Sequence, residues 1–83
     1  MKVEVRYFAS LREALGSGEG VDLAETTTVG ALRDALAARG GRHTDALGRQ
    51  RVVRSARNRV MCAESAPLVD GDEVGFFPPV TGG

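Results

Sequence analysis

The chain has 83 residues, equal numbers of basic and acidic side chains (11 Lys and Arg, 11 Asp and Glu), and one cysteine, Cys62. This length supports one small domain. Zero net charge gives the protein no general attraction to nucleic acid or membranes. A lone cysteine argues against a secreted scaffold held together by disulfides. Because charged and apolar residues alternate over residues 1–6, we expect neither a signal peptide nor a transmembrane segment. We therefore expect a cytoplasmic protein without a membrane partner.

The first strand and a short helix are predicted from the opening residues. Polar and apolar residues alternate over residues 2–9, which is typical of a strand with one buried face. That face is formed by Val3, Val5 and Tyr7. Ser10 and Glu13 have the spacing of a capping box, so we expect a helix that begins at Ser10 and ends at Gly16.

A second strand and the main helix are expected next. After a turn over residues 16–20, residues 21–23 are predicted to return as the second strand of a hairpin. Thr28 is a good N-cap for a helix over residues 29–39, which the glycines at 40 and 41 would end. The apolar positions of this helix recur at helical spacing, at Val29, Leu32, Ala35 and Leu36.

In the second half of the chain, apolar residues recur less regularly. Residues 42–50 predict a surface loop, residues 52–58 a strand, and residues 60–62 a short extended piece. The Asp-Gly-Asp run at 70–72 predicts a turn, and residues 73–77 predict the last strand. This order indicates an α+β fold in which one main helix covers a small mixed sheet, with the first and last strands adjacent and central.

The chain ends with Phe-Phe-Pro-Pro-Val-Thr-Gly-Gly over residues 76–83. The two prolines cannot donate hydrogen bonds to a sheet, so we expect a domain over residues 1–79 and a flexible tail over residues 80–83. Gly82 and Gly83 have no side chains, so the tail could thread a narrow tunnel and present its terminal carboxylate to the active site of another protein.

Arginines are concentrated in the middle of the chain. Residues 39–59 contain seven of them against a single acidic residue, Asp45. No aromatic residue lies among these arginines, so the segment lacks the stacking platform of a single-strand binder. We therefore expect a solvated or partner-facing surface and no nucleic-acid partner.

Several blocks of the sequence together resemble one family. They are Tyr7-Phe8-Ala9-Ser10-Leu11-Arg12-Glu13, Thr28-Val29 with Leu32, Ala56-x-Asn58, Pro67-Leu68-x-Asp70-Gly71-Asp72-Glu73-Val74, and the terminal octet. The resemblance is to the MoaD branch of the MoaD and ThiS family of ubiquitin-like sulfur carriers. Proteins of the MoaD branch are the small subunits of molybdopterin synthase. The resemblance implies the β-grasp fold. One departure concerns Ser55 and Arg57, which share a face with Val53 where the family is more apolar. Either that strand lies at an exposed edge or its register differs.

The resemblance also implies a function for the tail. A carboxylate with a pKa of about 3.5 is ionised at neutral pH and is a poor electrophile, so it must be activated first. In this family an E1-like adenylyltransferase uses ATP to adenylate the terminal glycine, here Gly83, and a sulfurtransferase then completes its conversion to a thiocarboxylate. The large subunit of a heterotetrameric synthase receives this tail, including Gly82 and Thr81, and sulfur passes to cyclic pyranopterin monophosphate. The chain itself would bind no cofactor, and the catalytic acids and bases would belong to the partner.

Three apolar residues match the partner-facing positions of the family. They are Phe8, Met61 and Phe77, and the alternative for each is ordinary core packing. Successive residues of a strand point to opposite faces, so Phe76 can lie in the core while Phe77 stays outside.

Other residues give weaker hypotheses. We interpret Cys62 as a small buried residue, since no second cysteine or nearby histidine supports thiol chemistry. His43 has no partner ligands nearby in the sequence, and the acids at 70, 72 and 73 fit a turn, so we expect no metal site. Two alternative functions stay open. The chain could carry sulfur for thiamine, cysteine or thionucleoside synthesis, or it could be a ubiquitin-like modifier or a binding module.

Overall fold

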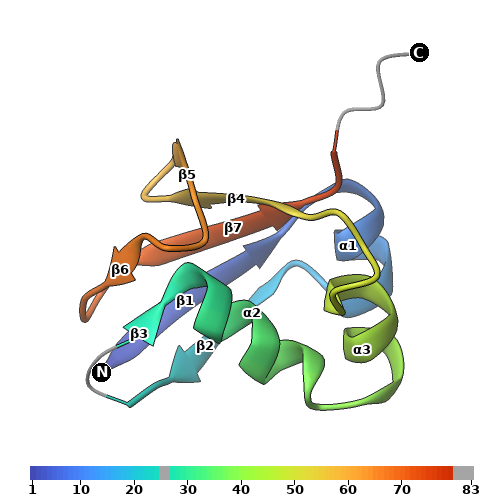
Figure 1. The fold of residues 1–83 in the computed structure, drawn as a ribbon, viewed down its shortest axis with the longest axis horizontal. Helices are drawn as coiled ribbons and strands as arrows, with labels where there is room; N and C mark the ends of the chain where they lie inside the picture. The colour runs from blue at the N-terminus through green and yellow to red at the C-terminus, as the bar shows by residue number, and fades with distance from the viewer. Residues whose placement is uncertain (25–26, 80–83) are drawn as a thin grey trace.

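A computed structural model describes residues 1–24 and 27–79, which form one mixed sheet covered by helices (Figure 1). The elements in chain order are β1 (Lys2–Tyr7), α1 (Ala9–Leu15), β2 (Gly18–Asp22), β3 (Thr27–Thr28), α2 (Val29–Ala37), α3 (Gly41–Leu47), β4 (Arg54–Arg57), β5 (Val60–Cys62), β6 (Pro67–Leu68) and β7 (Glu73–Phe77). Five strands make the main sheet in the order β2-β1-β7-β4-β5, and β3 pairs with β6 beside it. The α+β, β-grasp prediction is confirmed.

The first and last strands lie side by side at the centre of the sheet, as predicted. β1 and β7 run parallel, with Val5 opposite Val74 and Tyr7 opposite Phe76. β2 pairs with β1, and β4 with β7, both antiparallel. Because β1 and β7 run in the same direction, both end beside α1 and α3 (Figure 1). The chain therefore leaves the sheet next to these two short helices.

The inner face of the sheet packs against α2. Val5, Val74 and Phe76 from the strands and Leu32 from α2 have no exposed surface, and all belong to one buried cluster. Each such side chain contributes about 1.5–3 kcal/mol relative to an exposed one. No helix among the described residues is long and apolar enough to cross a membrane.

The start of α2 is as predicted and its end is slightly earlier. The Thr28 side chain accepts a hydrogen bond from the amide of Ala31 at 3.2 Å, so Thr28 is the N-cap. The helix ends at Ala37 rather than at residue 39, and Gly40 has a φ of 85°, which the absence of a side chain permits. Ala35 was predicted to be on the buried stripe but is exposed.

The capping box predicted at Ser10 and Glu13 is wrong. The N-cap of α1 is Phe8, which has no side-chain cap. Its amide donates to the carbonyl of Phe76 at 3.1 Å, while its own carbonyl accepts from Leu11 at 3.1 Å. Pairing with β7 therefore holds Phe8 extended, and the helix begins directly after it.

The predicted turn over residues 16–20 is also wrong in part. β2 begins at Gly18 because Gly18 pairs with Arg6 and Gly20 pairs with Glu4, so the hairpin is longer than its apolar residues suggest. This strand ends at Asp22. Glycines are poor strand formers, and pairing with β1 overrides that preference here.

Residues 42–50 were predicted to be a loop, but α3 occupies residues 41–47. Its residue Leu47 is fully buried, and the carbonyl of Leu47 accepts a hydrogen bond from the Arg33 Nε at 2.8 Å. A side chain from α2 therefore satisfies the end of this short helix. Such a contact between segments distant in the sequence leaves no local pattern.

The position of β4 in the sheet explains how the polar residues Ser55 and Arg57 occur where the family is more apolar. β4 lies between β7 and β5, and Ser55 pairs with Phe76 on the core face, where only 4% of Ser55 is exposed. The exposed-edge alternative is therefore wrong. Ser55 is accommodated because its hydroxyl donates to the carbonyl of Cys62 at 3.4 Å.

Candidate functional site: an apolar patch beside the end of β7

The chain terminus is only partly described. Gly83, Gly82 and Thr81, the residues expected to carry and present the reactive group, lie outside the described residues. The described part of the site is the end of β7, followed by Pro78 and Pro79. We therefore build the site from what surrounds these prolines.

Phe76 and Phe77 separate as predicted. Phe76 is fully buried on the inner face of the sheet, whereas Phe77 is half-buried on the outer face. This follows from the alternation of side chains along a strand. One strand thus supplies a core anchor and a surface ring at adjacent positions, immediately before the prolines.

Phe8 lies against Phe77. Their ring centroids are 6.0 Å apart with an angle of 78° between the ring planes, which is an edge-to-face contact. Phe8 nevertheless keeps 48% of its surface exposed. Core packing is therefore excluded for Phe8, and the two rings together form an aromatic surface at the base of the tail.

Met61 extends this surface across the sheet. Met61 pairs with Ala56 in β4, and Ala56 pairs with Gly75 in β7, so these three residues share the outer face with Phe77. Met61 is 57% exposed. We call Phe8, Met61 and Phe77 the outer patch. The structure brings the three predicted docking residues to one face, on the side away from α2.

Charged side chains border the outer patch. Arg54 is the register partner of Phe77 and is exposed. The Arg6 Nε lies 3.7 Å from a carboxylate oxygen of Glu73, and the Arg59 Nε lies 3.5 Å from the other. Exposed pairs of this kind contribute little to stability. An apolar centre with a charged rim is the usual anatomy of a protein interface.

A cleft of about 790 Å³ opens on the other side of the two prolines. It lies between α1, α3 and residues 50–53, and its lining includes Leu11, Val53, Pro78 and Pro79. The lining mixes apolar residues with polar and charged ones, among them Ser10, Glu13 and Arg42.

The acids of the predicted turn organise the loop before β7. One oxygen of Asp72 accepts from the amide of Val69 and the other from the Asn58 side-chain amide, both at 2.9 Å. The hydrogen bond from Asn58, then that from Val69, lowers the pKa of Asp72. Asp72 thus serves the turn.

Asn58 has a role that sequence reasoning missed. It and Arg59 both have positive φ, 50° and 68°, which fits the two-residue turn between β4 and β5. The signal was available, because asparagine is common in such turns. Asn58 holds the β4–β5 hairpin, which carries Met61, to the start of β7.

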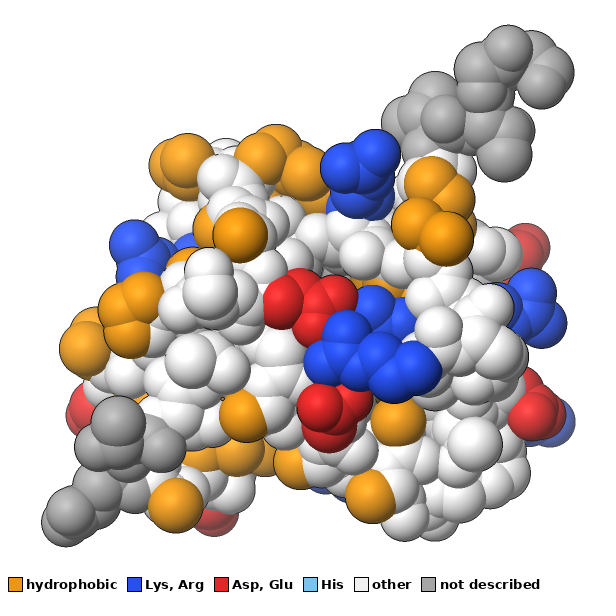
Figure 2. Space-filling model, in the orientation of Figure 1, with side chains coloured by type: hydrophobic (Ala, Val, Ile, Leu, Met, Phe, Trp, Pro, Cys, Tyr) orange, Lys and Arg blue, Asp and Glu red, His pale blue; other side chains and the backbone are white. Residues whose placement is uncertain are grey.

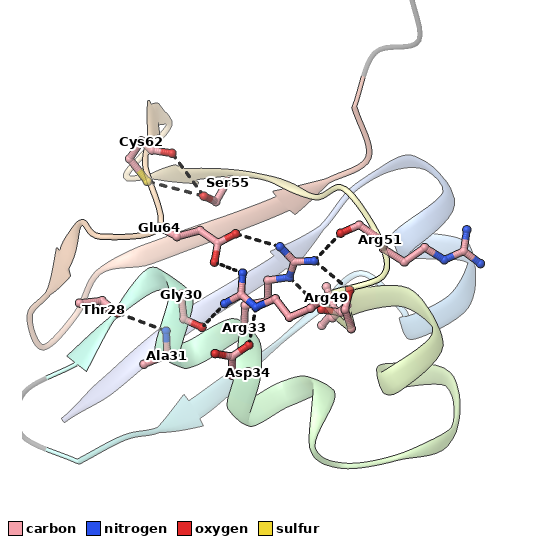
Figure 3. Close-up of polar contacts among 12 residues, drawn as sticks. Thr28, Gly30, Ala31, Arg33, Asp34, Arg49, Arg51, Ser55, Cys62 and Glu64 are labelled. Carbon is pink, nitrogen blue, oxygen red and sulfur yellow. Dashed lines mark hydrogen bonds and ion pairs between the residues drawn. The ribbon is translucent and has the colours of Figure 1, made fainter.

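A second missed feature is a cluster of ion pairs centred on Arg33. This side chain is 4% exposed and donates to the carbonyls of Leu47, Gly48 and Arg51 and to Glu64 (Figure 3). Arg49 lies beside it between Glu64 and Asp34 (Figure 3), and Figure 2 shows a group of basic side chains with acidic ones on two sides on this face of the molecule.

Glu64 is held in its charged form within this cluster. Burial alone would raise the pKa of Glu64, but hydrogen bonds from Arg49 and Arg33 outweigh burial and lower it. The cluster ties α2 to the loop after α3 and to the segment after β5. It explains one of the central arginines, Arg49, as part of the scaffold.

Cys62 and His43 each lie near one polar side chain. Cys62 is half-buried against the core, and its thiol lies 3.9 Å from the Ser55 hydroxyl (Figure 3). The His43 Nε2 lies 3.8 Å from a Glu19 carboxylate oxygen. Within residues 1–24 and 27–79, no group of three His, Cys, Asp or Glu side chains could hold a metal ion.

Comparison with known proteins relates the whole chain to one family. The chain is 42% identical over 81 residues to the molybdopterin synthase sulfur carrier subunit of Escherichia coli, which covers 98% of this chain and 99% of that protein. A solved structure from Helicobacter pylori, a complex of subunits 1 and 2 of molybdopterin-converting factor, matches with a TM-score of 0.70 and 28% identity over all of both chains.

A third similarity points to a different use of the same fold. Small archaeal modifier protein 1 of Haloferax volcanii matches with a TM-score of 0.69 and 31% identity, over 95% of this chain and 98% of that one. The model of the ThiS family matches residues 5–83, which is almost the whole chain. The chain therefore belongs to the ThiS family.

Proposed function

We propose that this protein is the sulfur carrier subunit of a molybdopterin synthase, with Gly83 as the covalent carrier. The observation that carries the proposal is the outer patch, an exposed apolar surface beside the base of a Gly-Gly tail. An apolar side chain that stays exposed in a small domain is typical of an interaction site when others lie beside it. The name and full-length similarity of the Escherichia coli relative support the same function.

The reaction requires a partner at each step. An E1-like adenylyltransferase would join the Gly83 carboxylate to the AMP part of ATP, with release of pyrophosphate. A sulfur nucleophile supplied by a sulfurtransferase would then displace AMP from the acyl carbon and leave a thiocarboxylate. Both steps need close approach to the acyl group, which the absence of side chains at Gly82 and Gly83 permits.

The final step would take place on the large synthase subunit. The outer patch would dock there and place the tail in the active site, where sulfur passes to cyclic pyranopterin monophosphate over two rounds. The complex of two subunits in the Helicobacter pylori neighbour supports this partner. This chain would supply the carrier and the docking surface, and the partner would supply the acids and bases. We expect no cofactor bound by this chain and no nucleic-acid partner.

Intact mass spectrometry tests the carrier role. After incubation with a cognate E1-like enzyme, ATP and a sulfur donor, the mass should rise by the difference between one sulfur and one oxygen atom. A variant with one residue added after Gly83 is the control, because the addition displaces the carboxylate by up to about 3.5 Å. Its circular dichroism spectrum should match that of the native protein. Equal sulfur loading of both proteins would contradict the proposal.

A ubiquitin-like modifier is the second candidate, favoured by the similarity to small archaeal modifier protein 1. A modifier would form isopeptide bonds between Gly83 and lysines of other proteins. Incubation of the activated protein with a cell lysate should then give adducts of higher mass that depend on Gly83. A carrier for thiamine, cysteine or thionucleoside synthesis would instead load sulfur normally and fail to pass it to the pterin precursor on the large subunit.

A further inference from the structure

Gly75 occupies a position where its own backbone does not require glycine. It lies in the middle of β7, between β1 and β4, and is buried. Glycine weakens the interior of a strand, because it loses the most backbone freedom on folding and adds no packing. Gly75 is absent from the residues with positive φ, so its backbone conformation suits any residue. Another constraint must account for it.

The constraint is the ring of Phe8. A Cβ atom at position 75 would lie 3.0 Å from the Phe8 Cε2, 3.7 Å from its Cδ2 and 3.9 Å from the Phe77 Cε1. The Phe8 ring therefore lies on the bare backbone of Gly75. The register partners of Gly75 are Arg6 in β1 and Ala56 in β4, and Ala56 is also small and only 9% exposed. Gly75 and Ala56 thus form the floor beneath the aromatic pair on the β4 side.

We propose that Gly75 is a positioning residue for partner docking. Because Gly75 lacks a side chain, one edge of the Phe8 ring can approach β7 closely while the ring contacts Phe77, and the two rings form one apolar surface. This proposal rests on the proposed function, since it assigns the outer patch to the protein that receives the tail. The partner side of the contact would be aliphatic or aromatic, because the rings offer no hydrogen-bonding group.

Holding Phe8 in place before binding favours association. A ring that is already immobilised loses less rotamer freedom when the partner docks. The backbone of Phe8 is fixed as well, because its amide donates to the carbonyl of Phe76 at 3.1 Å. A branched side chain at position 75 would lift the ring from the sheet while leaving this backbone contact intact. Gly75 acts only through Phe8.

A larger side chain at position 75 should weaken binding of the partner more. Alanine would place its Cβ 3.0 Å from Phe8 Cε2, which lies at the far end of an exposed ring that can move by a few tenths of an ångström. Valine adds two methyl groups that no such shift accommodates. We therefore expect Gly75→Ala to weaken binding slightly and Gly75→Val to weaken it strongly.

A double-mutant cycle tests the coupling of Gly75 to Phe8. The dissociation constant for the purified large synthase subunit is measured by calorimetry for the native protein, Gly75→Val, Phe8→Ala and the double variant. We expect each single variant to weaken binding by about tenfold or more, and the second change to add less than about twofold once the first is present.

Gly20→Val is the matched control. Gly20 lies in β2 on the same outer face and pairs with Glu4 of β1, and its added Cβ would meet only the flexible side chains of Lys2 and Glu4. The affinity of Gly20→Val should equal that of the native protein. A similar loss of affinity in this control would show that any valine on this face disturbs binding, and would overturn the assignment to Gly75.

The remaining outcomes are distinct. Native affinity in Gly75→Val with a large loss in Phe8→Ala would overturn the role of Gly75 and leave the docking face intact. Independent, additive losses would also overturn it, because they indicate a general effect on the sheet. If Gly75→Val does not fold, as judged by circular dichroism, the cycle is run with Gly75→Ala, where a loss of about two- to threefold should vanish in the Phe8→Ala background. Failure of sulfur loading on Gly83 would instead contradict the proposed function.

Discussion

The two faces of the central sheet make opposite use of apolar side chains. On the inner face, Val5, Val74 and Phe76 are fully buried beneath α2. On the outer face, no described helix covers the sheet, and Phe8 and Met61 keep about half of their surface exposed at 48% and 57%. Burial of apolar surface is the main driving force of folding. The exposed side chains of the outer patch therefore do not stabilise this small domain as buried ones would.

This difference separates a face that stabilises the fold from a face that stays exposed and available for contact. The outer patch is arranged around Gly75, and the Asn58 turn holds the hairpin that carries Met61. Both features order an exposed surface and add little to the core. An exposed surface that is also held rigid is well suited to bind a partner, because less freedom is lost on association.

The largest expected effect contrasts Phe76 with Phe77. Phe76→Ala should lower the free energy of unfolding by about 3–5 kcal/mol, since it leaves a cavity beneath α2. Phe77→Ala should lower it by less than about 1.5 kcal/mol, because the ring is only half-buried and its loss leaves a surface depression. Urea denaturation followed by circular dichroism measures both values. Equal losses would show that the outer face also supports the fold.

The central part of this contrast is visible in the sequence. Alternation at Val3, Val5 and Tyr7 identifies the inner face of β1, and helical spacing with a Thr28 cap identifies α2, because both patterns are local. The five-stranded order and α3 could not be read in the same way. The end of α3 is satisfied by Arg33 from another helix, and β2 is lengthened by pairing with β1, so tertiary contacts override weak local preferences there.

The sequence predicted the exposed residues of the outer patch but not the residues beneath them. Phe8, Met61 and Phe77 were identified through the family resemblance, and strand alternation alone separated Phe77 from Phe76. The floor of the patch was missed, because nothing local in the sequence shows that the Phe8 ring lies on Gly75, 67 positions away. A glycine in the middle of a predicted strand was the one available signal.

The second prediction moves from stability to binding. Phe77→Asp should weaken binding to the large synthase subunit by about thirtyfold or more, because it buries an unpaired charge in an apolar interface. The circular dichroism spectrum should not change. Arg12→Asp is a matched control, since Arg12 lies on α1 and outside the outer patch. Native affinity in Phe77→Asp would remove Phe77 from the docking surface.

The third prediction concerns the turn that supports Met61. Asn58→Ala should lower the free energy of unfolding by about 1–2 kcal/mol, because it breaks the hydrogen bonds to Asp72 and Glu73 and places alanine at positive φ. Asn58→Gly separates the two causes, since glycine accepts the backbone conformation but supplies no hydrogen bond. Denaturation in urea should rank the native protein first, Asn58→Gly second and Asn58→Ala last.

The smallest expected effect is a dependence of the protein's stability on pH. It should come from the polar turn before β7, because the apolar core has no group that titrates in the acid range. The pKa of Asp72 is lower in the folded protein than in the unfolded chain, because Asn58 and Val69 donate hydrogen bonds to its carboxylate. A lowered pKa means that the unfolded chain takes up a proton first as the pH falls. The stabilising contribution of Asp72 is thus fully present above an unfolded pKa of about 3.9 and is lost as the pH falls through the folded pKa.

Thermal unfolding between pH 7 and pH 2 tests this effect. The midpoint of the native protein should be nearly constant down to about pH 5 and should fall below about pH 4. In Asp72→Asn the midpoint should be lower at pH 7, and its fall at acid pH should be smaller. Some fall should persist, because Glu19, Asp34 and Glu64 also have lowered pKa values. An identical acid slope in both proteins would show that Asp72 does not contribute to the acid dependence of stability.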